Sequence, residues 1–147
     1  MPGKTAVVRH ITGLKFIGHA DSGHEVVLDS SDNGGPTTGT SPMEMVLVAL
    51  AACTGSDVAS ILRKKRARIS SFFVDVSAER AEEHPRVYTS IHVRYTAHAD
   101  RITGNDLQQA IDLSVSKYCS VSAMLKRGGV SMTTAGTVLP FGSEEPA

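Results

Sequence analysis

The chain has 147 residues, a length typical of one domain, and 41% of them are apolar, which is enough for a core. Fifteen basic residues balance fifteen acidic ones, so the overall charge gives no reason to expect a nucleic acid or an anionic membrane as partner. The N-terminus lacks the apolar segment of a signal peptide, and the apolar run 45–52 is shorter than the ~20 residues that span a bilayer. We expect a single cytoplasmic domain over residues 1–147, with residues 140–147 as a disordered tail.

The first part of the chain predicts three short strands and a loop. Residues 5–9, 14–19 and 25–29 are rich in β-branched residues, and the glycines between them favour an antiparallel hairpin or meander. Residues 30–40 (SSDNGGPTTGT) have loop composition throughout. This Ser30–Thr40 loop is either a lid or dimer contact or a mobile connector, and the sequence does not separate these readings.

Residues 41–66 predict a long buried helix. Ser41 is a suitable N-cap, Pro42 suits the first helical position, and Glu44 completes a capping box. The residues at 45–52 are all apolar, so the helix is expected to be buried on every side. Cys53 lies in the middle of this segment, and small residues at Gly55 and beyond would let another helix approach closely.

The second part of the chain predicts a hairpin, a second helix and a last strand. Residues 69–78 and 87–97 alternate between apolar and polar positions around a charged turn, which is typical of an antiparallel hairpin with one buried face. A helix is expected from Thr103, capped with Asp106, and it should break at Cys119 before a further helical turn over 121–126. Residues 130–139 predict the final strand, so the fold class is α+β.

A helix that is apolar all round needs more cover than one sheet provides. We therefore expect a second copy of the chain to supply the rest, since obligate interfaces resemble a core divided between two subunits.

The two cysteines, Cys53 and Cys119, are the first candidate site residues. A structural disulfide is not expected in a reducing compartment, so they are either inert core residues or a working redox pair. Cys119 lies where its own helix should break, among polar neighbours, which strengthens the case for a redox pair, although an inert core role stays the commoner one for such cysteines.

Other candidate sites have weaker support. The six histidines lack metal-ligand spacing to one another or to a cysteine, so neither a metal site nor a cofactor is expected. His92 or His98 could act as base for a cysteine in a Cys–His hydrolase, although a role as ordinary strand residues is favoured. The basic run 63–66 is better explained as the end of a helix, where cations stabilise the macrodipole, than as a nucleic-acid patch.

Two segments together resemble a known family. The helix SPMEMVLVALAACTGSDVASIL, followed by the predicted hairpin and by LSVSKYCSVSAML, is similar to the OsmC/Ohr family, and more closely to its YhfA-like branch. The resemblance runs over about residues 5–138 of the chain. It implies an OsmC-like α+β fold in which antiparallel sheets wrap two central helices in an intertwined homodimer.

The resemblance also implies a chemistry. Members of the family studied as enzymes are thiol peroxidases of the oxidative stress response that reduce organic hydroperoxides. By that likeness Cys53 would be the peroxidatic thiolate and Cys119 the resolving thiol, and an external dithiol reductant would restore them. The apolar helix around Cys53 would favour a small hydrophobic peroxide.

The sequence departs from the family pattern at the residues that activate the thiolate. The family enzymes carry a Glu ten positions before the first cysteine, and here that position is Met43, with Glu44 one residue later. One residue turns a helical side chain by about 100°, so Glu44 is expected to act as a cap. The only candidate for the partner arginine is Arg9, in a predicted strand. This departure favours an alternative function, a non-enzymatic protein that binds a small hydrophobic ligand in the dimer cleft.

Overall fold

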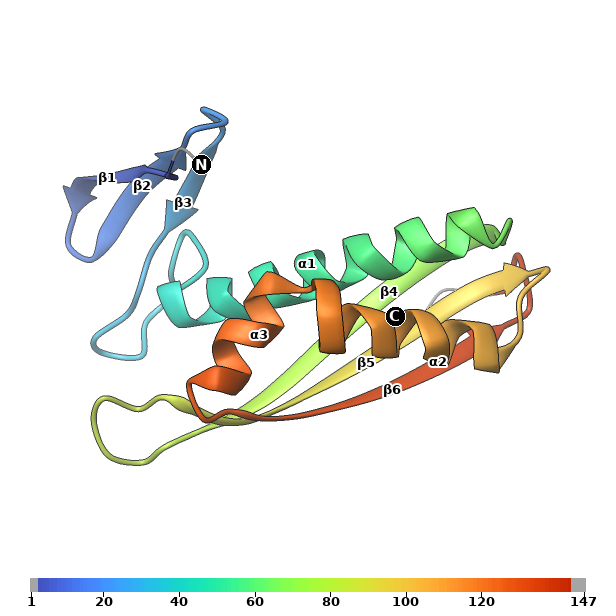
Figure 1. The fold of residues 1–147 in the computed structure, drawn as a ribbon. Helices are drawn as coiled ribbons and strands as arrows, with labels where there is room; N and C mark the ends of the chain where they lie inside the picture. The colour runs from blue at the N-terminus through green and yellow to red at the C-terminus, as the bar shows by residue number, and fades with distance from the viewer. Residues whose placement is uncertain (1–2, 144–147) are drawn as a thin grey trace. The chain divides into compact units, whose positions relative to one another are not determined.

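The computed structural model describes residues 3–143, which form two compact units divided between Leu47 and Val48. The boundary lies within α1 (Pro42–Lys64), the long helix that the sequence predicts, and each unit is described here by itself. The α+β class is confirmed, with two sheets and several helices (Figure 1). The expectations of a single domain and of an intertwined dimer stay predictions.

The N-terminal unit contains a three-stranded antiparallel sheet in the order β1–β2–β3. Its strands are β1 (Ala6–Thr12), β2 (Lys15–Ala20) and β3 (Glu25–Leu28), close to the predicted ranges. Gly13 and Gly23 have positive φ angles of 52° and 82°, which allow the two tight turns. All seven residues of β1 are exposed in the single chain, although the strand carries several apolar side chains.

The loop before α1 is closed by a carboxylate. Asp29 accepts hydrogen bonds from the backbone N–H and the hydroxyl of Thr38, at 2.9 and 3.1 Å. The Thr38 backbone hydrogen bond is the main reason that the pKa of Asp29 lies below its usual value. These hydrogen bonds join the two ends of the loop. The role of the Ser30–Thr40 loop as a lid stays a prediction.

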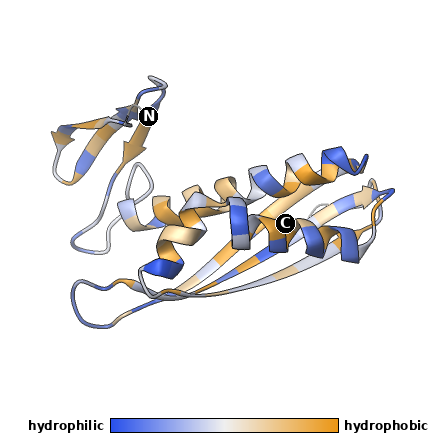
Figure 2. Ribbon diagram, in the orientation of Figure 1, coloured by the Kyte–Doolittle hydropathy of each residue, from blue (hydrophilic) through white to orange (hydrophobic). Residues whose placement is uncertain are grey.

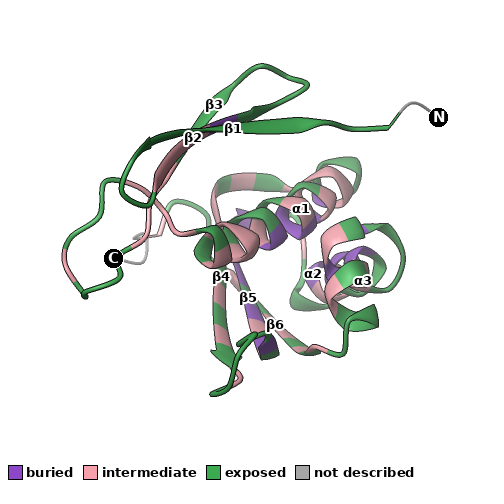
Figure 3. Ribbon diagram, turned by 90° about the vertical axis from the view of Figure 1, so that its left-hand side faces the viewer, coloured by how far each residue is buried: buried purple, intermediate pink, exposed green. Residues whose placement is uncertain are grey.

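The C-terminal unit contains a second sheet in the order β4–β5–β6. β4 (Arg68–Arg80) and β5 (Tyr88–Asp100) form the predicted antiparallel hairpin, and β6 (Ser131–Leu139) pairs with β5 in parallel. The helices α1, α2 (Gly104–Leu113) and α3 (Ser120–Arg127) cover the same face of this sheet (Figures 1 and 3). The alternate residues of β5 that face the helices are fully or nearly fully buried: Ile91, Val93, Tyr95 and Ala97.

Two glycines let the helices approach the sheet closely. A Cβ at Gly136 on β6 would lie 2.5 Å from Cδ1 of Ile111 and 3.1 Å from Cδ2 of Leu107, both on α2. A Cβ at Gly55 would lie 3.2 Å from a methyl group of Val74. The small residue at Gly55 therefore packs against strand β4, where the sequence had suggested another helix.

The predicted N-terminal caps of α1 and α2, and the predicted break at Cys119, are confirmed. Ser41 N–H donates to the Glu44 carboxylate at 3.0 Å, and Glu44 N–H donates to the Ser41 hydroxyl at 3.2 Å, which completes the capping box. Thr103 and Asp106 form the same motif at the start of α2. The helical path is interrupted after α2 by a π-helical turn, η1 (Ser114–Tyr118), and Cys119 then takes an extended conformation.

By length and composition alone, the helix α1 is long and apolar enough to cross a membrane. The sequence expectation differed, because it considered only the fully apolar run 45–52, which is too short for a membrane span. Core helices of folded domains share these properties, and α1 lies over a sheet. Figure 2 shows apolar residues along much of α1, with polar ones toward its C-terminal end. Thr54, fully buried in the middle of the helix, makes polar contacts with neighbouring elements.

The segment after β6 packs against the sheet as far as the described residues extend. Gly142 N–H donates to the Ser70 hydroxyl at 2.8 Å, and the Arg68 guanidinium lies 3.9 Å from the centroid of the Phe141 ring. His98 Nδ1 and the Ser143 hydroxyl are 2.6 Å apart. The disordered tail was expected over residues 140–147, of which 144–147 lie outside the described residues.

Candidate functional site

The two cysteines come from different elements of the C-terminal unit and are both free thiols. Cys53 lies in the middle of α1 and is half-buried. Cys119 lies between η1 and α3 and is only 2% exposed. Solvent therefore reaches Cys53 more readily than Cys119.

The π-helical turn places Cys119 at the start of α3. The backbone N–H of Cys119 donates to the carbonyl of Ser114 at 2.8 Å, which closes the wider turn. The sulfur of Cys119 then caps α3 by accepting the N–H of Ser122 at 3.4 Å. Single π-helical turns inside helices are frequent at functional sites, and this one ends at the predicted resolving thiol.

Burial and nearby groups change the pKa of the Cys119 thiol. Burial is the main cause that raises the pKa of Cys119 above its ordinary value. Hydrogen bonds from Ser122 act in the opposite direction, while a hydrogen bond and the negative charge of Cys53 raise the pKa further. Cys119 is therefore a protonated thiol near neutral pH, within electrostatic reach of Cys53.

A chain of buried hydroxyl groups lies beside the thiols, and it joins α1 to β5 and to η1. The Thr54 hydroxyl is 2.7 Å from the Tyr95 hydroxyl and 2.7 Å from the Ser114 hydroxyl. Ser114 donates to the Asp57 carboxylate at 2.8 Å. Thr54, Tyr95 and Ser114 are each 0% exposed, so these bonds form away from water.

The carboxylate fixes the direction of this hydroxyl chain. A carboxylate only accepts, and a hydroxyl has one proton to donate. Because Ser114 gives its proton to Asp57, Thr54 must donate to Ser114, and Tyr95 must then donate to Thr54. The four groups thus have one arrangement of protons, which satisfies each hydroxyl proton in a buried site.

Tyr95 stays protonated, as this arrangement requires. Burial is the main cause that raises the pKa of Tyr95 above its ordinary value, and the hydrogen bond with Thr54 lowers it. The negative charge of Asp57, and that of Cys119 once it ionises, raise the pKa of Tyr95 further. The charge of Cys119, when this thiol is ionised, is thus one of the causes that raise the pKa of Tyr95.

The hydroxyl chain is not evident from the sequence, because its members are far apart along the chain. Tyr95 lies in the alternating segment 87–97, and Thr54 directly follows Cys53 in the chain. The available signal was the presence of hydroxyl groups at positions whose periodicity predicts burial. Such groups need partners inside the protein, and here they are partners of one another.

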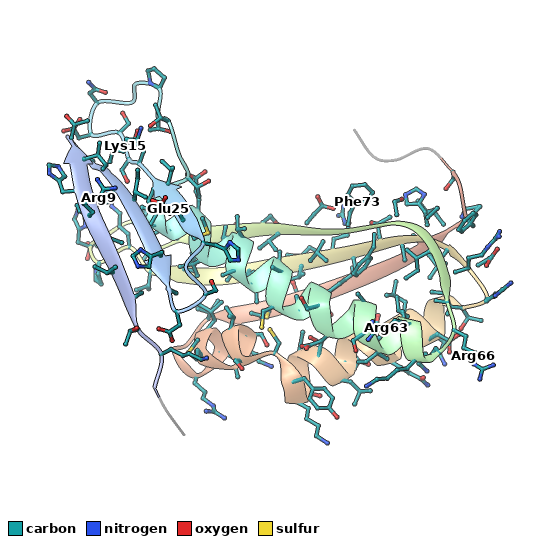
Figure 4. The ribbon with its side chains drawn as sticks, turned by 90° about the horizontal axis from the view of Figure 1, so that it is seen from above. Arg9, Lys15, Glu25, Arg63, Arg66 and Phe73 are labelled. Atoms are coloured by element: carbon teal, nitrogen blue, oxygen red, sulfur yellow. The ribbon has the colours of Figure 1, made fainter. Side chains whose placement is uncertain are left out.

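The predicted supporting residues, Glu44 and Arg9, both lie in the N-terminal unit. The carboxylate of Glu44 accepts the backbone N–H of Ser41, and this bond is the main cause that lowers the pKa of Glu44. Arg9 is exposed on β1 (Figure 4). Neither side chain forms an ion pair with another residue in the range 3–143.

The two histidines considered as bases have other partners. His92 Nδ1 lies 2.6 Å from the Thr133 hydroxyl, and His98 Nδ1 lies 2.6 Å from the Ser143 hydroxyl. No observation therefore supports a Cys–His hydrolase. Among residues 3–143, no three His, Cys, Asp or Glu side chains are grouped so that they could hold a metal ion.

A cavity of about 210 Å³ opens beside Cys119. It lies between the end of η1 and one side of α3. Its lining comprises Val115, Ser116, Lys117, Cys119, Ala123, Lys126 and Arg127. Basic side chains therefore border a cavity whose lining includes the residue Cys119.

Comparisons with known proteins agree with this fold. A family profile described as OsmC-like protein matches residues 34–135. Protein YhfA of Escherichia coli K12 is 41% identical over 127 residues, which cover 83% of this chain and 89% of that protein.

Solved structures give the same result. A hypothetical protein from Aquifex aeolicus has a TM-score of 0.84 and 30% identity, and covers 99% of this chain and 100% of its own. An OsmC-like protein from Mycoplasma pneumoniae has a TM-score of 0.75 at 17% identity, covering 93% of this chain and 96% of its own. The organic hydroperoxide resistance protein OhrB of Bacillus subtilis has a TM-score of 0.60 at 18% identity, covering 92% of this chain and 98% of its own. At these lower identities the likeness concerns the fold alone.

Proposed function

Because the chain belongs to the OsmC-like protein family, we propose that it is a thiol-dependent peroxidase that reduces organic hydroperoxides. The observation that carries the proposal is the pair of free thiols in one unit, with Cys53 half-buried and Cys119 buried. Several structural neighbours are organic hydroperoxide resistance proteins, which is consistent with this chemistry.

Cys53 is the attacking thiol in this proposal. Its thiolate attacks the terminal oxygen of the hydroperoxide, the O–O bond breaks, and the alkoxide takes a proton and leaves as an alcohol. The sulfur is oxidised to sulfenic acid, and the peroxide is reduced. Cys53 is preferred for this step because it is the more exposed thiol, whereas burial keeps Cys119 protonated.

Cys119 resolves the sulfenic acid. Its sulfur attacks the sulfur of Cys53, and the hydroxyl group leaves with a proton as water. The disulfide bond of about 2.05 Å requires the two free thiols to approach each other. An external dithiol then reduces the disulfide by two exchange steps and becomes oxidised itself.

The proposal includes a cytoplasmic homodimer. Apolar side chains are unusually exposed in both units of the single chain, including Val7 and Val8 on β1, at 54% and 55%, and Val48 on α1, at 54%. Apolar surface of this kind marks contact with another molecule. Sedimentation should give twice the mass of the chain at micromolar concentration, and a monomer would contradict this part of the proposal.

The test of the reaction uses cumene hydroperoxide with dithiothreitol as reductant. We expect Cys53→Ser to lose the protein-dependent consumption of peroxide, while Cys119→Ser, mixed with the peroxide before any reductant is added, accumulates the sulfenic acid. The matched control is Ser116→Ala, which changes an exposed side chain near Cys119 and keeps both thiols. Equal rates for the wild type and Cys53→Ser would refute the peroxidase.

A second candidate function is a non-enzymatic protein that binds a small hydrophobic ligand in a dimer cleft. The observation that favours it is the use of Glu44 as a helix cap, which leaves no role for it beside a thiolate. Native mass spectrometry of the purified protein should then show a retained apolar compound. Retention of such a compound by an inactive wild type would favour this second function over the peroxidase.

A further inference from the structure

Ser114 connects the helix that carries Cys53 to the turn that ends at Cys119. It is the first residue of η1, between α2 and α3, and these two helices lie beside α1 over the sheet (Figures 1 and 3). Its hydroxyl donates to the Asp57 carboxylate of α1 at 2.8 Å and accepts a hydrogen bond from the Thr54 hydroxyl of the same helix at 2.7 Å. Its carbonyl accepts the backbone N–H of Cys119 at 2.8 Å. The side chain of Ser114 is thus bound to α1, and its backbone is bound to Cys119.

The two partners of Ser114 on α1 are close to Cys53 along the helix. Thr54 follows Cys53 directly, and Asp57 lies four residues after Cys53, about one helical turn away. Side chains four residues apart are neighbours on a helix surface, so Asp57 lies on the same side of α1 as Cys53. The hydrogen bonds of Ser114 therefore fix η1 to the part of α1 that carries the attacking thiol.

The other hydrogen bonds described above for Cys119 hold it to α3. The sulfur of Cys119 accepts the N–H of Ser122 at 3.4 Å, and the Ser122 hydroxyl donates to the Cys119 carbonyl at 3.0 Å. These bonds determine how Cys119 starts α3, and they do not place it against α1. The backbone link from Cys119 to α1 is supplied by Ser114.

The polar character of this link indicates a role in placement. Ser114 and Thr54 are 0% exposed, and the half-buried Asp57 forms no ion pair with a basic side chain among residues 3–143. Replacement of both partners of a buried hydrogen bond by apolar groups of the same shape is often nearly neutral for stability. Apolar packing does not supply direction, whereas a fully satisfied buried network specifies one arrangement of the elements that it joins.

We propose that Ser114 and Asp57 are positioning residues, which hold Cys119 in register with Cys53 for formation of the disulfide. The inference rests on the proposed redox pair and concerns its second step alone. A disulfide has a bond length of about 2.05 Å and a narrow range of geometries, so its formation depends on how η1 is placed against α1. A displacement of about 1 Å between reacting groups can slow a reaction about 100-fold. Attack on the hydroperoxide uses Cys53 without Cys119 and does not depend on this placement.

The step that depends on the register is the condensation of the two sulfur atoms. The Cys119 thiol gives up its proton, its sulfur attacks the sulfur of the Cys53 sulfenic acid, and the S–O bond breaks. The hydroxide that leaves takes up a proton and becomes water. The oxidising equivalents come from the hydroperoxide of the first step. Ser114 and Asp57 exchange no proton with the reactants and act through the placement of Cys119.

The stability of the disulfide against glutathione measures this register without peroxide. Full-length proteins are equilibrated with mixtures of reduced and oxidised glutathione, quenched with acid, alkylated and analysed by mass spectrometry. Two glutathione thiols reduce the protein disulfide by successive exchange, and one glutathione disulfide forms. A loss of stability that is equal in the reduced and oxidised proteins leaves this equilibrium unchanged, whereas a lost register weakens the disulfide.

Ser114→Ala removes both hydrogen bonds to α1. We expect it to weaken the disulfide about tenfold, which is the size of effect that a hydrogen bond to a charged group supports. A tenfold change raises the reduction potential by about 30 mV. The matched control is Ser116→Ala, which removes an exposed hydroxyl of the same turn that donates to the Asp112 carbonyl and not to α1. The control should keep the potential of the wild type, and an equal shift in both variants would overturn the proposal.

Two substitutions of Asp57 separate the hydrogen bond from the charge. The carbonyl of the new side chain in Asp57→Asn can still accept the Ser114 hydroxyl, so the disulfide should stay within about threefold of the wild-type stability. Asp57→Ala removes the acceptor and should shift the potential in the same direction as Ser114→Ala, which it replaces should that variant fail to fold. Equal effects of Asp57→Asn and Asp57→Ala would overturn positioning by this hydrogen bond.

A single turnover with cumene hydroperoxide adds a kinetic measurement. Ser114→Ala should consume the hydroperoxide at the wild-type rate, whereas the sulfenic acid of Cys53 should persist for longer and be trapped by dimedone. Disulfide formation as fast as in the wild type, or equal slowing of both steps, would overturn the proposal.

The two proposals fail separately. A wild type that forms the disulfide in glutathione but consumes no hydroperoxide refutes the peroxidase, and the potentials of the variants still decide the positioning. A wild type that consumes hydroperoxide, with an unchanged potential in Ser114→Ala, keeps the peroxidase and overturns the positioning. A wild type that forms no disulfide in glutathione also overturns the positioning.

Discussion

The hydroxyl group of Thr54 is predicted to stabilise the fold through its two buried bonds. The substitution Thr54→Val keeps the shape of the side chain and removes the hydroxyl. Tyr95 then loses its acceptor and Ser114 loses a donor, in a site with no access to water. A buried donor without a partner costs about 1–3 kcal/mol, and the second lost bond adds to this, so we expect a loss of about 2–3 kcal/mol.

The matched variant Thr54→Ser keeps the hydroxyl and removes only a methyl group. Its cost should be that of a small cavity, about 1 kcal/mol. The order of stability is therefore wild type, then Ser, then Val, although Val is the closer match in shape. A packing role without hydrogen bonds predicts the opposite order for the two variants.

Urea unfolding measures this order from the transition midpoint and slope. All proteins should be compared at one concentration, because association with a second copy shifts the apparent stability. A Thr54→Val variant that is as stable as Thr54→Ser would refute the directed hydroxyl chain.

Three further predictions concern single groups. Burial raises the pKa of Cys119, so the rate of its alkylation in Cys53→Ser should rise only at a pH above the pKa of an ordinary cysteine. A rise in the alkylation rate centred below the pKa of an ordinary cysteine would contradict the buried thiol. Gly136→Ala should lower the free energy of unfolding by about 1–3 kcal/mol, because the added Cβ overpacks against α2. The control Gly104→Ala should change this free energy little, because the added Cβ would lie in open space. Equal effects of the two substitutions on urea unfolding would refute this packing. The folded-state pKa of Glu44 lies below its usual value, so its stabilising effect is present above the unfolded pKa and is lost as the pH falls through the folded one, and Glu44→Gln should reduce this acid dependence in thermal unfolding.

Much of the fold is predictable because local patterns determine it. The hairpin of β4 and β5 follows from alternating apolar residues, and both capping boxes follow from their residue spacing. The break at Cys119 is likewise indicated by its polar surroundings. The parallel pairing of β6 with β5 is different, because it depends on where α2, η1 and α3 return the chain.

The candidate site is less predictable, because its groups come from distant parts of the chain. Thr54 and Ser114 are 60 positions apart, and no local pattern shows that their hydroxyls meet. The cavity at Cys119 depends on the π-helical turn, which brings Lys117 beside side chains of α3. Pairing of distant polar groups is decided by packing, which one sequence does not display.

The state of the two thiols after one equivalent of hydroperoxide tests the central claim most directly. Reduced protein should be mixed with cumene hydroperoxide without a reductant, then alkylated and analysed by mass spectrometry under non-reducing conditions. The redox pair predicts that Cys53 and Cys119 both escape alkylation and are joined in one disulfide within the chain. Full alkylation of both cysteines after exposure to the hydroperoxide would contradict the account.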